Sequence, residues 1–115
     1  MIVGGTLLVQ LDATPTDPAV RQLRQDVGDI LESRSLNGLV LDLRSVDAMD
    51  SYITRCIRDL AIGARLMGLP TVVCGVQPSV ADTLVEMGLD LGDVPTVLNI
   101  DVALRLLSRS RAAAR

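Results

Sequence analysis

Apolar side chains form short continuous runs at residues 6–11, 39–43 and 71–76. These runs are rich in Leu and Val and are bounded by turn residues, a pattern that predicts strands. The run at 39–43 is almost entirely apolar, as expected for a strand that is buried on both faces of a sheet. Residues 1–3 and 95–98 predict two further short strands, the second at a sheet edge, where proline is tolerated.

Between and after these strands, apolar residues recur at three- and four-residue spacing, which predicts amphipathic helices. The helices are expected at residues 17–33, 51–68, 78–88 and 99–107. Asp17 and Asn99 are suitable N-caps, while Gly68 and Gly88 are typical helix ends. The strand at 39–43, the helix after it and the strand at 71–76 predict a βαβ unit in which these two strands are parallel. We therefore expect one α/β domain over residues 1–115, with a solvated, disordered basic tail at about 108–115.

The charge and hydropathy of the chain exclude two kinds of partner. The formal net charge is −3, which argues against general nucleic-acid binding, and the arginines after Asp101 suit a helix end and a solvated tail. No apolar run approaches the roughly 20 residues that cross a bilayer, and no signal peptide is recognised. We expect no nucleic-acid or membrane partner and a cytoplasmic location.

Histidine and lysine are both absent from the sequence. Histidine is the usual general base and the commonest metal ligand, and lysine serves Walker-type phosphate sites and Schiff bases. Most enzyme classes are thereby excluded, so we expect a non-enzymatic protein without a cofactor. Cys56 and Cys74 lack the spacing of a metal motif and fall in a predicted helix and a predicted strand, so both are expected to be core residues.

An acidic loop separates the strand at 39–43 from the helix that begins at Ser51. Asp42, Asp47 and Asp50 could hold Mg²⁺ as in receiver domains. Such a site also needs acidic residues on an earlier strand and a lysine on a later one. We favour carboxylates that are solvated or that cap the helix, and expect no metal.

Ser51 lies where unpaired backbone N–H groups and the helix dipole favour a phosphate group. One interpretation is that Ser51 or Asp50 only caps the helix. The other is that Ser51 is a phosphorylation site, because the sequence offers no histidine or lysine base that would make it a nucleophile. Residues 75–78 also join a strand to a helix, but Pro78 lacks the N–H that would contact phosphate, so this segment is interpreted as a connector.

Two stretches of the sequence resemble a known family. Residues 46–51, Val-Asp-Ala-Met-Asp-Ser, resemble the signature of STAS domains, the anti-sigma factor antagonists. Residues 66–89, which contain Leu-Met-Gly and Gly-Val-Gln-Pro, resemble the stressosome branch, in particular scaffold subunits of the RsbS type. The resemblance covers about residues 6–107. It implies an α/β fold with a mixed four- to five-stranded sheet and about four helices packed mainly on one side.

The resemblance also implies a function and a set of partners. In the family, the serine that matches Ser51 is phosphorylated by an RsbT-type switch kinase and dephosphorylated by an RsbX-type phosphatase. The unphosphorylated scaffold holds the kinase, and it co-assembles with RsbR-type STAS paralogues; we also expect a homo-oligomer. Thr54 is a candidate minor phosphorylation site. The partner-binding surface is expected around Asp47, Asp50, Ser51, Tyr52 and Arg55.

Three alternatives stay open on the sequence. The first is a simple anti-sigma factor antagonist that binds an anti-sigma factor kinase one to one. The second is a small-molecule-binding domain, which requires a pocket. The third is the metal-binding receiver domain described above.

Overall fold

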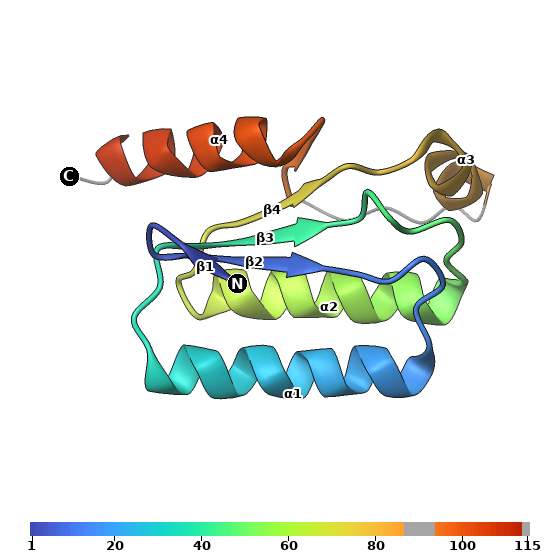
Figure 1. Cartoon of the computed structure of the whole chain (residues 1–115), viewed down its shortest axis with the longest axis horizontal. Coiled ribbons are helices and arrows are strands. Elements are labelled where there is room, and N and C mark those ends of the chain that lie inside the picture. The colour runs from blue at the N-terminus through green and yellow to red at the C-terminus, as the bar shows by residue number, and fades with distance from the viewer. Residues whose placement is uncertain (87–93, 114–115) are drawn as a thin grey trace.

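Five strands form one sheet, in which their spatial order is the same as their order along the chain. The structure, a computed structural model, describes residues 1–86 and 94–113. The strands are β1 (Ile2–Val3), β2 (Thr6–Gln10), β3 (Gly38–Asp42), β4 (Thr71–Cys74) and β5 (Thr96–Val97). The helices are α1 (Asp17–Ser33), α2 (Ser51–Leu66), α3 (Pro78–Glu86) and α4 (Ile100–Ala113) (Figure 1).

The sheet is mixed, because three of its four strand pairs are parallel and one is antiparallel. β2 pairs with β3, β3 with β4 and β4 with β5 in parallel. The β3–β4 pair confirms the predicted βαβ unit. β1 turns back on β2 through Gly4 and Gly5, whose φ values of 57° and 83° are accessible to glycine. Residues 1–3 therefore complete one edge of the sheet, and β5 forms the other.

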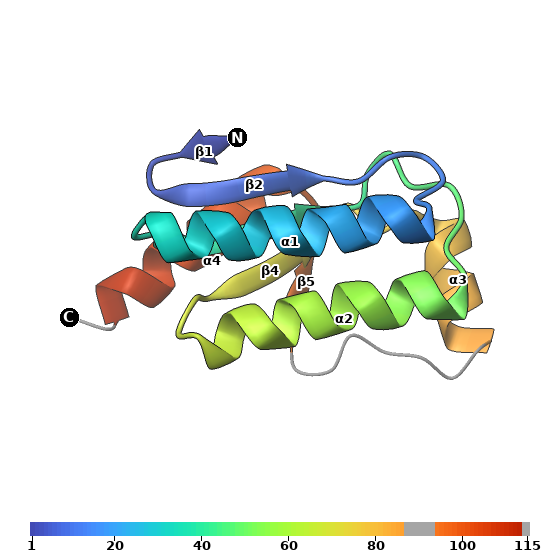
Figure 2. The same ribbon diagram turned by 90° about the horizontal axis from the view of Figure 1, so that it is seen from below.

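Helices cover both faces of the sheet. Figures 1 and 2 show α1 and α2 side by side along one face and α4 along the opposite face. Inward side chains of α1, α2 and α3 share one buried cluster with residues of β2 and β3, including Leu39 and Leu41. Ala103 and Leu107 of α4 form a second buried cluster with Val40 on the other face. The α/β fold with most helices on one side is thus as predicted, and α4 is the exception.

Several predicted boundaries differ from the structure by a few residues. α1 is capped by Thr16, whose Oγ1 accepts a hydrogen bond from the Ala19 N–H at 3.3 Å, so Asp17 is the first helical residue and not the cap. Asn99 caps α4 as expected, since its Oδ1 accepts from the Val102 N–H at 3.0 Å. The predicted end of α3 at Gly88 lies outside the described residues.

The C-terminal segment also differs from the prediction. Residues 108–113, expected to belong to a disordered tail, continue the helix α4. Alanine and arginine are both strong helix formers, so the sequence of this segment favours helix. The last two residues, 114–115, lie outside the described residues.

Candidate functional site

Three loops meet at the carboxyl edge of the parallel strands. They are the β2–α1 loop (residues 11–16), the β3–α2 loop (43–50) and the β4–α3 loop (75–77). The Asp47 N–H donates to the Ala13 carbonyl at 2.8 Å and joins the first two loops, while the Leu43 N–H donates at 2.9 Å to the carbonyl of Cys74, the last residue of β4. Loops at this edge of a parallel sheet are where α/β proteins place their binding residues.

Ser51 is the first residue of α2, and Asp50 is its N-cap. The Asp50 Oδ1 accepts a hydrogen bond from the Ile53 N–H at 2.8 Å, so the capping interpretation holds for Asp50 and leaves the serine hydroxyl without that task. The Ser51 side chain is exposed, and its hydroxyl has no hydrogen bond within the part of the chain that the structure describes. A group of this kind is accessible to a modifying enzyme.

The neighbours of Ser51 on α2 differ in accessibility. Tyr52, on the first turn of α2, and Arg55, on the next turn, are both exposed. Thr54 is only 1% exposed, and its hydroxyl donates to the Asp50 carbonyl at 2.8 Å. A kinase would have to open this turn to reach Thr54, whereas Ser51 requires no opening.

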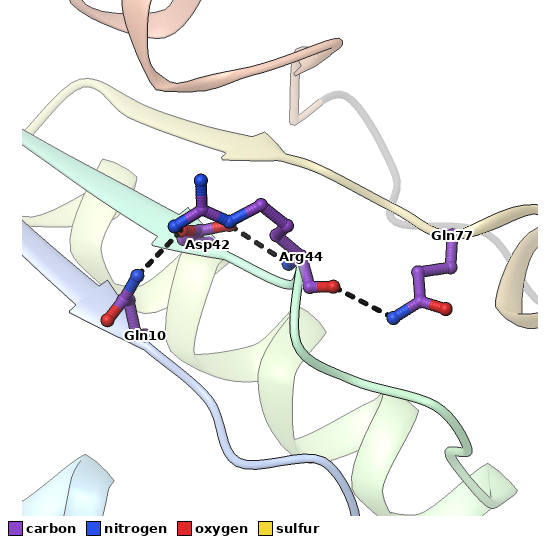
Figure 3. A network of polar contacts seen from close by, with 4 residues as sticks. All are labelled: Gln10, Asp42, Arg44 and Gln77. Atoms are coloured by element: carbon purple, nitrogen blue, oxygen red, sulfur yellow. Dashed lines mark hydrogen bonds and ion pairs between the residues drawn. The ribbon is translucent and has the colours of Figure 1, made fainter.

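A buried carboxylate organises the inner side of the site (Figure 3). Asp42, at the end of β3, is 2% exposed and accepts a hydrogen bond from Gln10 Nε2 at 3.1 Å. Its other oxygen, Oδ1, accepts from the Arg44 N–H at 2.9 Å, and the Arg44 guanidinium lies 3.8 Å from Oδ2, the oxygen that Gln10 contacts. A buried charge needs such partners. Asp42 therefore joins β2 and β3 to the start of the β3–α2 loop.

Gln77 holds the outer side of the same loop. Its Nε2 donates to the Arg44 carbonyl at 2.8 Å (Figure 3). The same nitrogen lies 3.3 Å from Asp47 Oδ1. Gly75 lets the β4–α3 loop come this close: its φ is +74°, and a Cβ there would lie 3.0 Å from Asp42 Oδ1 and 3.1 Å from the Arg44 nitrogen. Residues 75–78, interpreted as a connector, thus also brace the loop that precedes Ser51.

Gln10 and Gln77 are site residues that the sequence analysis missed. Glutamine has no preferred chemistry in a motif, and each of these side chains finds its partner more than 30 residues away, so spacing gives no signal. For Gln77 a weak signal exists, because the Gln-Pro turn is part of the stretch that resembles the stressosome branch. No local pattern marks Gln10.

The two cysteines are buried and unpaired by disulfide. Burial, together with the negative charge of Asp42, raises the pKa of the Cys74 thiol from 9.0 to about 11, although Arg44 opposes the shift. At neutral pH, Cys74 is therefore a protonated core side chain beside the Asp42 carboxylate, in keeping with the expectation of core cysteines.

Metal and small-molecule sites were the open alternatives. Among the described residues, no group of three or more His, Cys, Asp or Glu side chains is placed to hold a metal ion. An open groove of about 290 Å³ lies between the β2–α1 loop and the helix α1. Its apolar lining includes Leu11, Val20 and Leu23, and its polar lining includes Asp12 and Asp26. That volume is at the lower limit of ligand pockets. Within the described residues, no helix is long and apolar enough to cross a membrane.

Comparison with known proteins identifies the family. The STAS domain model matches residues 2–103. The chain belongs to the STAS domain family. RsbS of Moorella thermoacetica, in a variant with a serine-to-glutamate substitution, is 32% identical in sequence with a TM-score of 0.84, over 97% of this chain and 95% of that one.

Two further relatives match this STAS chain over most of its length. A chain from the stressosome, described as a signal integration and transduction hub, is 30% identical with a TM-score of 0.80, over 96% of each chain. The RsbT co-antagonist protein RsbRD of Bacillus subtilis is 29% identical over 84 residues, which are 73% of this chain but 30% of RsbRD. The STAS chain thus spans less than a third of that relative.

Proposed function

We propose that this STAS chain is a non-enzymatic stressosome scaffold that sequesters a serine/threonine switch kinase and releases it when Ser51 is phosphorylated. The observation that carries the proposal is the state of Ser51, which is exposed at the first position of α2 while Asp50 supplies the cap. The hydroxyl is therefore free to accept a phosphoryl group without loss of the helix end.

The relatives support the choice of partners. RsbRD is named a co-antagonist of RsbT, and the two structural relatives described above are RsbS and a chain from the stressosome. We infer an RsbT-like kinase as the sequestered partner, RsbR-like STAS paralogues as co-assembling subunits, and an RsbX-like phosphatase that restores the hydroxyl. The chain is inferred to act as a dimer or a larger homo-oligomer within that assembly.

Phosphorylation acts through charge in this proposal. A phosphate adds about −1.5 to −2 charges, which the α2 N-terminus accommodates and which Asp47 and Asp50 oppose. Both acidic side chains are exposed, so solvent weakens the repulsion and the fold stays the same. A kinase surface that fits a neutral hydroxyl would instead meet a dianion, at a cost of several kcal/mol if the contact is buried.

The proposal is tested with Ser51→Ala and Ser51→Asp variants and a purified RsbT-like kinase. We expect Ser51→Ala to bind the kinase like the wild type and to gain no phosphate, as read by intact mass after incubation with ATP. Ser51→Asp is expected to bind at least about tenfold more weakly, because one negative charge meets the docked surface. Ser35→Asp is the matched control, since Ser35 is an exposed serine in the α1–β3 loop, at the amino end of the parallel strands and away from Ser51.

Equal binding by Ser51→Ala and Ser51→Asp, or phosphate uptake by Ser51→Ala, would contradict the proposed switch. The alternative, a simple antagonist, is separated by size. A scaffold should elute far above its own 12.3 kDa when it is mixed with an RsbR-like chain, whereas a simple antagonist should form only a one-to-one complex with its kinase.

A further inference from the structure

One side chain, that of Gln77, joins the β4–α3 loop to the β3–α2 loop that leads into Ser51. Its amide reaches two acceptors that are three residues apart, the Arg44 carbonyl at 2.8 Å and the Asp47 carboxylate at 3.3 Å. The other tethers of this loop come from different directions: Asp42 bonds the Arg44 N–H, and the Ala13 carbonyl bonds the Asp47 N–H. Gln77 thus secures a side of the loop that those contacts leave free.

The backbone of Gln77 is itself fixed. Gly75, two residues before it, is packed against Asp42 and Arg44, and Pro78 directly after it is the first residue of α3. Proline holds φ near −65°, so the glutamine sits between two constrained positions. The side chain is half-buried, which limits its other conformations. Because the Gln77 side chain is restrained in this way, its amide can fix the position of the β3–α2 loop.

We propose that Gln77 is a positioning residue for partner binding: it holds the β3–α2 loop in the conformation that the switch kinase recognises. The inference rests on the proposed function, and it adds the β4–α3 loop to the residues that support partner binding. Without Gln77, the Asp47 carboxylate and the Arg44 carbonyl lose this tether and the loop gains freedom on that side, so binding must order it at an entropic cost.

The same geometry predicts which step suffers. Ser51 is part of α2, whose N-terminus is still capped by Asp50 when the loop becomes more mobile, so the position of the Ser51 hydroxyl should not change. We expect loss of Gln77 to raise the KM of the kinase for this chain about tenfold, the effect of one or two hydrogen bonds, with kcat within about twofold. A variant that merely destabilised the whole fold would not separate the two constants in this way.

The first variant is Gln77→Ala, which removes the donor. Gln77→Lys keeps donors at the end of a long side chain and is expected to rescue KM to within about threefold of the wild type. Gln25→Ala is the matched control, because the Gln25 amide also donates to an aspartate, Asp29 at 3.0 Å, but on the exposed face of α1.

Amide hydrogen exchange on the free protein supplies a readout that needs no kinase. In Gln77→Ala, the amides of Val46 and Asp47 are expected to exchange about tenfold faster, while that of Val27 in α1 and the thermal midpoint match those of Gln25→Ala.

The inference is overturned if Gln77→Ala and Gln25→Ala share the same exchange rates and the same KM, or if Gln77→Lys is as impaired as Gln77→Ala. If the wild type gained no phosphate on Ser51, the proposed function would fail instead, and the exchange comparison would still decide whether Gln77 positions the loop.

Discussion

Asp42 illustrates how a charged residue can be a candidate metal ligand in sequence and have a structural role in the fold. Its position at the end of an apolar strand left a metal ligand open as the less favoured alternative, and both of its oxygens are engaged by Gln10 and Arg44. The carboxylate is 2% exposed and orders the start of the loop before Ser51. Its contribution to function is therefore indirect, through the shape of that loop.

Cys74 gives a prediction at the residue scale. Its pKa is raised to about 11 by burial and by Asp42, so the folded state retains a proton that the unfolded chain loses from about pH 9. Because the folded state binds more protons in this window, its free energy of unfolding should fall as the pH rises from 9 to 11. Urea unfolding at several pH values measures this decline.

A Cys74→Ala variant is the control for that measurement, since its alkaline decline should be smaller. Labelling supplies a second check: at pH 8, iodoacetamide should modify Cys74 in the native protein at least about 100-fold more slowly than in urea. Peptide mapping separates this signal from that of Cys56. Rapid labelling of native Cys74 would contradict the buried, protonated thiol.

The residue-scale predictions from sequence succeeded where chemistry is local. The alternation of apolar residues and the turn residues placed Ser51 at a helix start, and the structure confirms that position. The sequence could not decide between Ser51 and Asp50 as the cap, because both side chains offer a suitable oxygen. It could not find Gln10 or Gln77, because their partners lie far along the chain.

At the scale of elements, glycines set how closely the helices and strands approach. Gly38 of β3 faces α4, and a Cβ on it would lie 2.9 Å from Leu107 Cδ1. Gly63 lies within α2, and a Cβ on it would meet nothing within 4 Å. Packing therefore requires glycine at position 38, whereas glycine at position 63 only lowers the helix propensity of α2.

These two glycines predict opposite effects of the same substitution. Gly63→Ala should stabilise the protein by about 0.5–1 kcal/mol, the helix propensity gained in α2. Gly38→Ala should destabilise it by about 1–3 kcal/mol, because Leu107 must move in a packed core. Urea unfolding followed by circular dichroism measures both, and equal effects of the two variants would show that the contact with Leu107 is not limiting.

Element boundaries show where sequence reasoning stops. The chain offers both Thr16 and Asp17 as caps before Pro18, and proline is accepted anywhere in the first turn, so the choice of Thr16 depends on three-dimensional detail. The predicted strand at 71–76 ends at Cys74, because Gly75 adopts a positive φ that turns the chain. Apolar content alone does not reveal that turn.

At the scale of the whole molecule, the sheet is buried on both faces and lies between two hydrophobic clusters. β2, β3 and β4 each contribute side chains both to the cluster under α1 and α2 and to the cluster under α4. The sequence predicted a doubly buried strand at 39–43, and β3 is buried along its whole length. A helix that covers the second face is the physical requirement of such a strand.

The single tyrosine, Tyr52, lies on α2 and can report whether the two faces unfold together. Leu107→Ala, on the α4 face, should destabilise the protein by about 2–4 kcal/mol through a cavity. If the molecule is one cooperative unit, Tyr52 fluorescence and circular dichroism should shift to the same lower urea midpoint. A shift in circular dichroism alone would mean that α4 opens by itself.

Leu98→Ala is the control for this experiment. Leu98 is 80% exposed, so its truncation should change the stability by no more than about 0.5 kcal/mol. A loss comparable with that of Leu107→Ala would contradict the assignment of the α4 core.

The identical order of the strands in space and along the chain bears on how the protein is made. From β2 onward, each strand that leaves the ribosome finds its neighbour already synthesised, so no pairing has to wait for a distant segment. The face under α4 is different, because α4 follows every strand in the chain. Val40, Val72 and Cys74 therefore stay uncovered until about residue 107 has emerged, and during that interval the nascent chain is most in need of protection from aggregation.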